Sequence, residues 1–351
     1  MSRLQRMGVA LGALFVAALL PRLLPEILPG MQRLTWTTAS AVAVLFGFGI
    51  LSVVILTGYA GQVSLCQATF MGISAFTTAS LVNHGINFFV AAVGGVLASF
   101  LLGVIVGIPA LRLKGITLAI VTVGVALGFD DYFFKDKAFD WFNGGVGGWS
   151  IDGASLFGVD LSNLKFETLV NAYWVIIAVF AVVAILVVNL HDSGSGRRLR
   201  AIRDSEVAAA TMGIDLTRFK LLAFGFAAAV AGIGGAFFPL IQGTVTAQPF
   251  NFFVSLQFAA VAVLVGIRFV PAAAVGGMFM ALVPQVLNAV QGAFKVEISG
   301  NWFNAALGAL LILQMITLPD GVWGQWAEGM EKLIGRTTHL PVPEPSRVVT
   351  S

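Results

Sequence analysis

Long apolar stretches separated by short polar ones occupy most of the chain. A bilayer core about 30 Å thick is crossed by a helix of about 20 apolar residues. The stretches that meet this length are 7–28, 34–57, 62–83, 88–111, 115–134, 169–190, 219–242, 250–267, 271–292 and 302–318. The pattern therefore predicts an all-α integral membrane protein, a polytopic bundle of about ten transmembrane helices.

Lysine and arginine fall on alternate connections between these stretches. The positive positions are Arg3 and Arg6, Arg112 and Lys114, the loop 191–218, Arg268, and Lys332 with Arg336. The other connections are 29–33, 84–87, 243–249, 293–301 and the long loop 135–168, with Arg33 as the exception. Because positive loops stay on the cytoplasmic side, we expect a multi-pass protein with both termini in the cytoplasm and the loop 135–168 outside.

Composition excludes the soluble classes. Only 11% of the 351 residues are charged and 58% are hydrophobic, whereas about 25% of the residues of a soluble domain are charged. The net charge of +3 is accounted for by the basic loops, so no nucleic-acid partner is expected. We expect residues 1–324 to form one transmembrane domain and residues 325–351 a polar cytoplasmic tail.

The chain offers no constellation for catalysis or metal binding. Cys66 is the single cysteine, which excludes an internal disulfide, and the three histidines lack metal-ligand spacing. No GxxxxGK(S/T) loop is present, so we expect neither ATP hydrolysis by this chain nor a cofactor. No Asp, Glu, Lys or Arg occurs from Leu34 to Leu111, which argues against proton coupling. Sodium coupling through backbone carbonyls stays open.

Two glycine-rich stretches interrupt the helical pattern, one at 58–65 and one from 232 to 249. Breaks at corresponding places in two halves indicate an inverted repeat with helices broken near a substrate path. Close packing of helices against glycine explains the same composition. In the loop 135–168, Trp141 and Trp149 accompany several glycines and acids, which fits either contact with a partner or anchoring at the membrane interface.

The loop 191–218 is the most charge-dense long segment between apolar stretches. Leu199, Ile202, Glu206, Ala209 and Gly213 recur at intervals of three or four, which predicts one helix with these residues along a single stripe. Small side chains let a partner approach the backbone, and Gly213 is placed to end the helix. Docking on a soluble partner and lying on the membrane surface both remain open on physical grounds.

The motif E-x-A-A-x-x-x-G at Glu206, Ala208, Ala209 and Gly213 resembles the EAA coupling loop of bacterial ABC importer permeases. More narrowly, GRRLRAIRDSEVAAATMGIDLTRFKLLAF and GYAGQVSLCQATFMGISAFTTASL resemble two hallmarks of the branched-chain amino acid permeases. The likeness runs from about residue 36 to about residue 290. The chain departs from the family pattern in the turn 266–269 and where Cys66 and Gln67 replace Gly-His. If the usual histidine touches substrate, the exchange at Gln67 puts the exact substrate in doubt.

The resemblance implies a transport subunit in the bacterial plasma membrane. Its partners would be two ATP-binding subunits, a second permease subunit and an extracytoplasmic substrate-binding protein. Glu206, Ala208, Ala209 and Gly213 would dock on the ATPase, assisted by Arg200 and Arg203. The alternatives are an ABC permease for urea or short amides, and a stand-alone channel or sodium-coupled carrier.

Four polar residues in apolar sequence are the candidates for a substrate path. They are Gln62, Ser64, Gln67 and Thr69. Gln62 and Thr69 are seven apart, so they share a face if the segment is helical. Amide and hydroxyl groups suit a zwitterionic amino acid, because they hydrogen-bond it without trapping it. The alternative is hydrogen bonding between helices within the bundle.

Overall fold

The computed structural model describes residues 33–113, 115–150, 155–156, 159–160, 166–267, 270–294 and 308–309. The elements in chain order are α2 (Arg33–Val53), η1 (Val54–Tyr59), α3 (Gln67–Asn83), α4 (Phe88–Ala110), α5 (Ile116–Gly128), η2 (Phe129–Phe133), η3 (Lys137–Phe139), α6 (Asp140–Asn143), η4 (Gly145–Gly147), β1 (Trp149–Ser150), β2 (Ser155–Leu156), β3 (Val159–Asp160), α7 (Phe166–Asp192), α8 (Gly194–Asp204), α9 (Glu206–Thr211), α10 (Leu216–Gln242), β4 (Thr244–Val245), η5 (Gln248–Phe250), α11 (Phe252–Val265) and α12 (Val270–Phe294). The protein is an all-α polytopic membrane protein.

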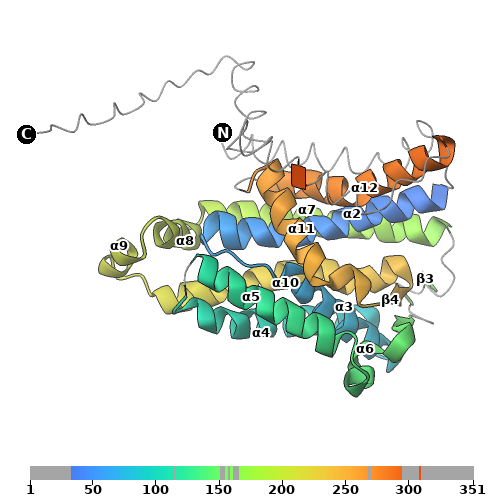
Figure 1. Cartoon of the computed structure of the whole chain (residues 1–351), viewed down its shortest axis with the longest axis horizontal. Helices are drawn as coiled ribbons and strands as arrows, with labels where there is room; N and C mark the ends of the chain where they lie inside the picture. Colours follow the sequence, from blue (N-terminus) through green and yellow to red (C-terminus); the bar gives the residue numbers. More distant parts are fainter. Residues whose placement is uncertain are drawn as a thin grey trace, which may run out of the picture.

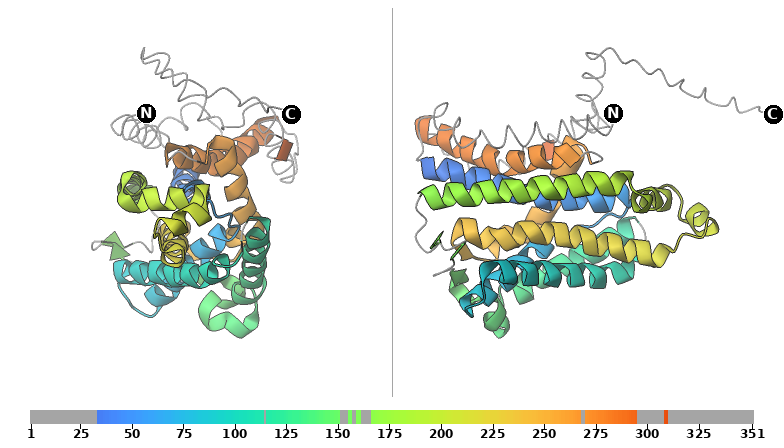
Figure 2. Two further views of the ribbon diagram at one scale, coloured as in Figure 1. Left: turned by 90° about the vertical axis from the view of Figure 1, so that its left-hand side faces the viewer. Right: turned by 180° about the vertical axis from the view of Figure 1, so that it is seen from behind.

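The long helices lie side by side along one axis (Figure 1). Seen from behind, α12, then α2 with α7, then α10, then α4 follow one another across the bundle (Figure 2). The centre is α2 and α10, because 89% and 72% of their most apolar stretches are buried, against 22% for α5. The surfaces of α4 and α5 are therefore left for lipid or for another subunit.

Five helices among the described residues are long and apolar enough to cross a membrane. They extend over Leu34–Tyr59, Phe88–Ala110, Ile116–Phe133, Leu169–Asp192 and Leu216–Gln242. The helices α3, α11 and α12 match the predicted spans 62–83, 250–267 and 271–292, except that α3 begins only at Gln67. The described residues do not include the predicted span 7–28, the positions Arg3, Arg6, Lys332 and Arg336, or the tail 325–351, and they include only 308–309 of the predicted span 302–318. The count of ten therefore stays a prediction.

Glycine brings the central helices into close contact. A Cβ atom on Gly235 of α10 would overlap the carbonyl oxygen of Met71 on α3, and one on Gly277 of α12 would overlap the carbonyl oxygen of Ala43 on α2. Membrane helices use small residues in this way, because close backbone approach gives dispersion energy that lipid cannot supply. The stretch 232–235 is therefore a packing surface.

The two predicted breaks have different outcomes. The first is present: η1 is a π-helical turn, and residues 61–66 are non-helical before α3 begins. In the second stretch, 232–249, α10 runs unbroken to Gln242 through its glycines and Pro239, so the interruption begins only at Gly243. Gly243, with φ of 71°, ends the helix. The inverted repeat stays a prediction.

The described part of the loop 135–168 packs against α3 and against β4, which follows α10. Trp149 and Ser150 of β1 pair antiparallel with Val245 and Thr244 of β4, and β2 pairs antiparallel with β3. The Trp149 indole donates to the carbonyl oxygen of Phe142 at 2.8 Å, whereas Trp141 is 70% exposed. Of the two tryptophans, Trp141 is therefore the one placed to meet an interface.

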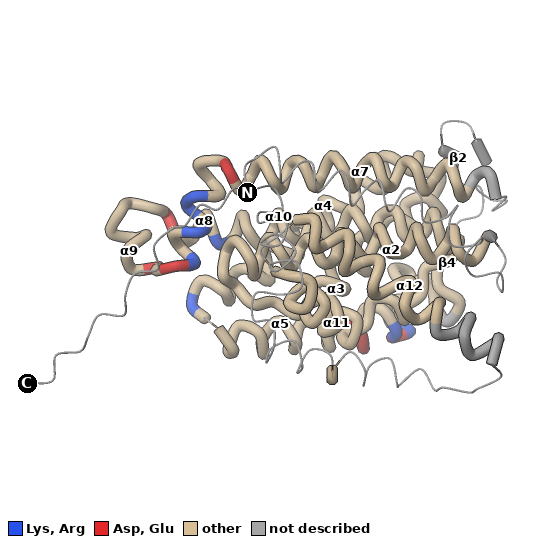
Figure 3. The backbone as a smooth tube through the Cα atoms, turned by 90° about the horizontal axis from the view of Figure 1, so that it is seen from above, with Lys and Arg blue, Asp and Glu red and all other residues tan. Residues whose placement is uncertain are grey.

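Most charged residues of the described chain gather at one end of the bundle, and a small group lies apart from them, farther along the bundle (Figure 3). We call the end that carries α8, α9 and Arg112 the charged end. Lys135 and Lys137 follow η2, at the other end of α5 from Arg112, and Lys135 pairs with Asp130 at 2.6 Å. Asp130 is buried and falls within the predicted span 115–134, but it was not among the residues that the sequence analysis singled out.

Candidate functional site

Two helices, rather than one, form the charged end. The Ser193 hydroxyl accepts from the Gly196 N–H and begins α8, and the Ser205 hydroxyl accepts from the Ala208 N–H and begins α9. At Ser205 the backbone is extended, with φ of −160° and ψ of 111°. The predicted single helix with one stripe from Leu199 to Gly213 is therefore wrong, because an N-cap serine divides it.

Each of the two helices buries a small inner face. Leu199 and Ile202 of α8 are 5% and 3% exposed, and Ala209 of α9 is 1% exposed. On the outer side of α9, Val207 and Met212 are 75% and 76% exposed. The structure therefore places Ala209 inward, and the exposed apolar tip of α9 consists of residues that the sequence reading did not single out.

Gly213 ends α9 in the left-handed region, with φ of 79°. Its N–H bonds to the Ala210 carbonyl and the Ile214 N–H to the Ala209 carbonyl, so the last carbonyls of this short helix are satisfied. No described atom lies within 4 Å of where its Cβ would be. Gly213 and the exposed Ala208 therefore belong to the outer surface.

Glu206 is tied to the bundle. Its carboxylate lies 2.8 Å from the Lys220 ammonium, and the two side chains are 23% and 4% exposed. Lys220 also donates to the Ala110 carbonyl oxygen at 3.5 Å, which links α9 to the first turn of α10 and to the end of α4. A buried ammonium requires such a partner, so Glu206 holds α9 in place.

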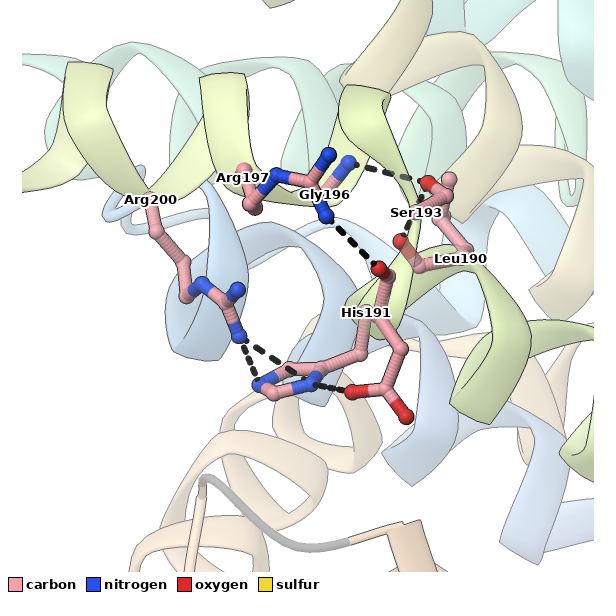
Figure 4. A network of polar contacts seen from close by, with 7 residues as sticks. Leu190, His191, Ser193, Gly196, Arg197 and Arg200 are labelled. Atoms are coloured by element: carbon pink, nitrogen blue, oxygen red, sulfur yellow. Dashed lines mark hydrogen bonds and ion pairs between the residues drawn. The ribbon is translucent and has the colours of Figure 1, made fainter. Parts of the chain in front are cut away.

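Arg200 turns back onto α7 (Figure 4). Its guanidinium donates to His191 Nε2 at 2.5 Å, while His191 Nδ1 lies 2.9 Å from the Asp192 carboxylate. The tautomer with its proton on Nδ1 satisfies both contacts. The His191 ring also packs on Tyr59, with centroids 4.9 Å apart, so this cluster joins α8, α7 and η1.

Arg203 also points into the protein. It donates from Nη1 to the Gly58 carbonyl oxygen at 2.8 Å, and its Nε lies 3.0 Å from the Asp204 carboxylate. Both arginines that were assigned to a partner surface therefore make contacts within the chain, although each keeps part of its surface exposed.

The polar segment, residues 58–69, leads from η1 into α3. Gln62, Gln67 and Thr69 are 7%, 0% and 1% exposed. None of these three side chains has a hydrogen-bond partner among the residues that the structure describes. A buried polar group without a partner costs about 1–3 kcal/mol, so these three side chains are suited to bind a ligand or water. Because residues 61–66 are not helical, Gln62 and Thr69 do not share a helix face.

Other polar groups nearby are satisfied within the chain. Ser64 Oγ lies 3.1 Å from Cys66 Sγ, the Leu65 N–H donates to Thr122 Oγ1, and the Ala68 N–H donates to Ser255 Oγ. Ser64 thus has a partner, unlike the other three path candidates. Thr122 and Ser255 lie on α5 and α11. The sequence did not predict their role, because a single hydroxyl in an apolar helix has no distinctive pattern.

No group of three histidine, cysteine or acidic side chains that could hold a metal ion occurs in the described part of the chain. The chemistry available at the site is therefore hydrogen bonding by neutral amides and hydroxyls in the polar segment, and ion pairing at the charged end.

Comparison with known proteins gives the family. The model of the branched-chain amino acid transport system permease component matches residues 32–315. The permease protein LivM of the high-affinity branched-chain amino acid transport system of Salmonella typhimurium is 31% identical over 81% of this chain and 68% of its own length. LivM of Escherichia coli is 29% identical over the same shares. The permease LivH of Salmonella typhimurium is 24% identical over 51% of this chain and 53% of its own. No solved structure matches the chain significantly.

The match covers α2 to α12 without interruption, including the polar segment and the charged end. The matched residues form a multi-pass helical bundle, and the relatives that they resemble are permease proteins. The chain belongs to the branched-chain amino acid ABC transporter permease family.

Proposed function

We propose that this chain is a membrane-spanning subunit of an ABC importer for branched-chain or related amino acids. Separate cytoplasmic subunits hydrolyse ATP, a second permease completes the pathway, and an extracytoplasmic binding protein delivers the solute. The charged end faces the cytoplasm, following the positive-inside rule. The observation that carries the proposal is the exposed apolar tip of α9 at the positively charged end of a chain of this family.

The docking surface for the ATPase consists of the outer face of α9. Val207, Ala208 and Met212 are exposed there beside Gly213. A short helix with small and apolar outer residues fits a groove on a soluble partner, because apolar groups gain most from leaving water. Glu206 and Ala209 support this surface from within, by the ion pair with Lys220 and by packing.

The solute path runs along the polar segment. Gln62, Gln67 and Thr69 offer amide and hydroxyl groups that lack partners in the described chain. A neutral lining suits a zwitterion, because it bonds both the ammonium and the carboxylate without a fixed charge that would hold one of them. Ser64, whose hydroxyl contacts Cys66, has a smaller role in this path.

The first test is purification of the tagged chain in mild detergent with identification of the proteins that accompany it. We expect two P-loop ATPases and a second permease. Reconstituted with the binding protein, the complex should take up radiolabelled leucine, isoleucine or valine only when ATP is present. Urea and acetamide, offered to the same vesicles, report on the alternative cargo.

Three outcomes would contradict the proposal in different ways. Uptake of urea or acetamide in place of amino acids would keep the ABC architecture and replace the cargo. A chain that purifies alone and moves solute without ATP would be a channel. Uptake that follows a sodium gradient without ATP would make it a carrier.

Replacing Gln67 with leucine separates binding from folding. The leucine removes a fully buried amide without a described partner, so we expect the thermal unfolding midpoint to stay the same or rise. Loss of one hydrogen bond to solute, about 1.4 kcal/mol, should weaken the apparent affinity of the permease step about tenfold. Initial uptake rates at several binding-protein concentrations measure this change.

Ser255→Ala is the matched control. The Ser255 hydroxyl accepts the Ala68 N–H at 3.0 Å, so its removal leaves a buried backbone donor unpaired, which costs about 1–3 kcal/mol. We expect a lower unfolding midpoint in this variant and little change in apparent affinity. Unchanged uptake kinetics in Gln67→Leu would remove Gln67 from the path.

A further inference from the structure

Arg203 lies where the charged end meets the polar segment. Its Nη1 donates to the carbonyl oxygen of Gly58, in the last turn of η1, at 2.8 Å. Its Nε and Nη2 both lie 3.0 Å from one carboxylate oxygen of Asp204. The guanidinium is a rigid planar fork. Because Asp204 holds it from one side, the hydrogen bond to Gly58 has a fixed direction.

The stem of Arg203 fits against a second glycine. Gly61 has φ of 69°, a conformation that favours glycine. A Cβ atom at this position would overlap Arg203 Cγ and lie 3.0 Å from Arg203 Cβ. The side chain of Arg203 therefore fills the space that a side chain at position 61 would take, and it contacts the turn 58–61 at both ends.

The same turn is fixed to its other neighbours. A Cβ atom on Gly58 would overlap the carbonyl oxygen of Ile267, which lies between α11 and α12. The Gln62 N–H donates to the Leu56 carbonyl at 3.0 Å, and Thr57 Oγ1 donates to the Gln62 carbonyl at 3.1 Å. Residues 56–62 are thus one hydrogen-bonded unit, so a displacement of Gly58 carries Gln62 with it.

We propose that Arg203 is a positioning residue that transmits movement of α8 to the turn 58–61, and through it to Gln62. The inference rests on the proposed function, since α8 and α9 would move with the ATPases. It gives Arg203 the role of a rigid link between that movement and the polar segment, in place of the auxiliary role at the docking surface that the sequence suggested.

The test is Arg203→Ala in the whole transport complex, reconstituted in vesicles. We expect the ATPases to remain bound and to hydrolyse ATP at close to the wild-type rate. The amount of amino acid taken up per ATP hydrolysed should fall about tenfold, within the range by which residues between two coupled sites change coupling. Arg203→Lys keeps the charge but loses the fork, so its uptake per ATP should fall as well.

Asp204→Asn is the matched control at the neighbouring position. It removes the exposed charge but keeps a side-chain oxygen that can accept from Arg203, so the direction of the hydrogen bond to Gly58, and with it uptake per ATP, should stay at the wild-type value. Wild-type uptake per ATP in Arg203→Ala would overturn the proposal. Loss of the ATPases from that variant would also overturn it, because Arg203 would then belong to the docking surface.

A covalent link tests the same contact from the other side. In a Cys66→Ala background, which has no other cysteine, the pair Gly61→Cys and Arg203→Cys places two Cβ positions 3.0 Å apart. A disulfide needs about 3.5–4.5 Å, so the two Cβ atoms must move slightly apart, and the cysteine at position 61 must also adopt or relax the φ of 69°. We expect the oxidised variant to recover uptake per ATP and dithiothreitol to abolish the recovery.

Three results of this variant would contradict a rigid link. If no disulfide forms, Gly61 and Arg203 are not in contact. If the oxidised form is inactive and the reduced form active, this contact must open during transport. Equal uptake per ATP in the two forms would show that no link is needed. Disulfide formation is read by gel mobility after free thiols are labelled with a polyethylene glycol maleimide, with and without prior reduction, and it needs no transport. If the wild-type complex itself showed no ATP-dependent uptake, the proposed function would fail. Disulfide formation would still test the contact between positions 61 and 203.

Discussion

Replacing Gly235 with valine should abolish the accumulation of folded protein in the membrane. Gly235 lies in the middle of α10, and a Cβ atom there would overlap the carbonyl oxygen of Met71 and lie 2.7 Å from its carbonyl carbon. The obstacle is backbone of α3, which has no rotamer to change, so the two helices must separate. Overpacking of this kind costs about 3 kcal/mol, a large part of a stability of about 5–15 kcal/mol.

The measurement is the yield of monodisperse protein on size exclusion in detergent, together with its thermal unfolding midpoint. Gly124→Val is the matched control, since Gly124 lies in the apolar helix α5 and has no described atom within 4 Å of its Cβ position. We expect the control to behave as the wild type. Equal yields for the two variants would contradict the packing of α10 against α3.

The helices of the bundle could be predicted from apolar stretches because lipid imposes a length on each of them. The stretches 88–111 and 169–190 correspond closely to α4 and α7. The same rule does not place the start of α3, because Gln62, Ser64 and Gln67 stand in apolar sequence whether or not the backbone is helical. The start of α3 depends on tertiary contacts, because the Leu65 N–H donates to Thr122 Oγ1 on another helix.

Glycine composition did not distinguish a break from a packing surface. In the stretch 232–235 the glycines face neighbouring helices, as Gly234 faces the carbonyl oxygen of Leu45, and the helix continues. At Gly61 the positive φ interrupts the helix. The difference depends on which atoms approach from other elements, and residues in sequence order do not contain that information.

The division of the charged loop could have been predicted. Ser205 followed by Glu206 is a helix start signal, with a capping serine and an acid in the first turn. The inward direction of the Arg203 side chain could not have been predicted, since it depends on the carbonyl oxygen of Gly58, which is 145 residues away in the chain. The periodicity of Leu199, Ile202 and Ala209 did indicate a buried face, although two helices share it.

Replacing Gly213 with tryptophan should abolish uptake while the protein still inserts and folds. Gly213 borders the exposed tip formed by Val207 and Met212 and has open space around its Cβ position. The indole therefore meets no described atom, although tryptophan must adopt the positive φ of this position. It occupies the surface where the ATPase would approach. Co-purification of the ATPases and ATP-dependent uptake are the readouts, with the unfolding midpoint as the check on folding.

Two smaller changes at Gly213 separate bulk from backbone strain. Alanine adds only a methyl group but must adopt φ of 79°, which costs about 1–2 kcal/mol. Asparagine tolerates this conformation better. If docking needs a clear surface, alanine and asparagine keep most of the uptake and tryptophan does not. If alanine is as inactive as tryptophan while asparagine is active, the turn after α9 matters and the surface does not. Normal uptake in the tryptophan variant would remove this face of α9 from the coupling between ATP hydrolysis and transport.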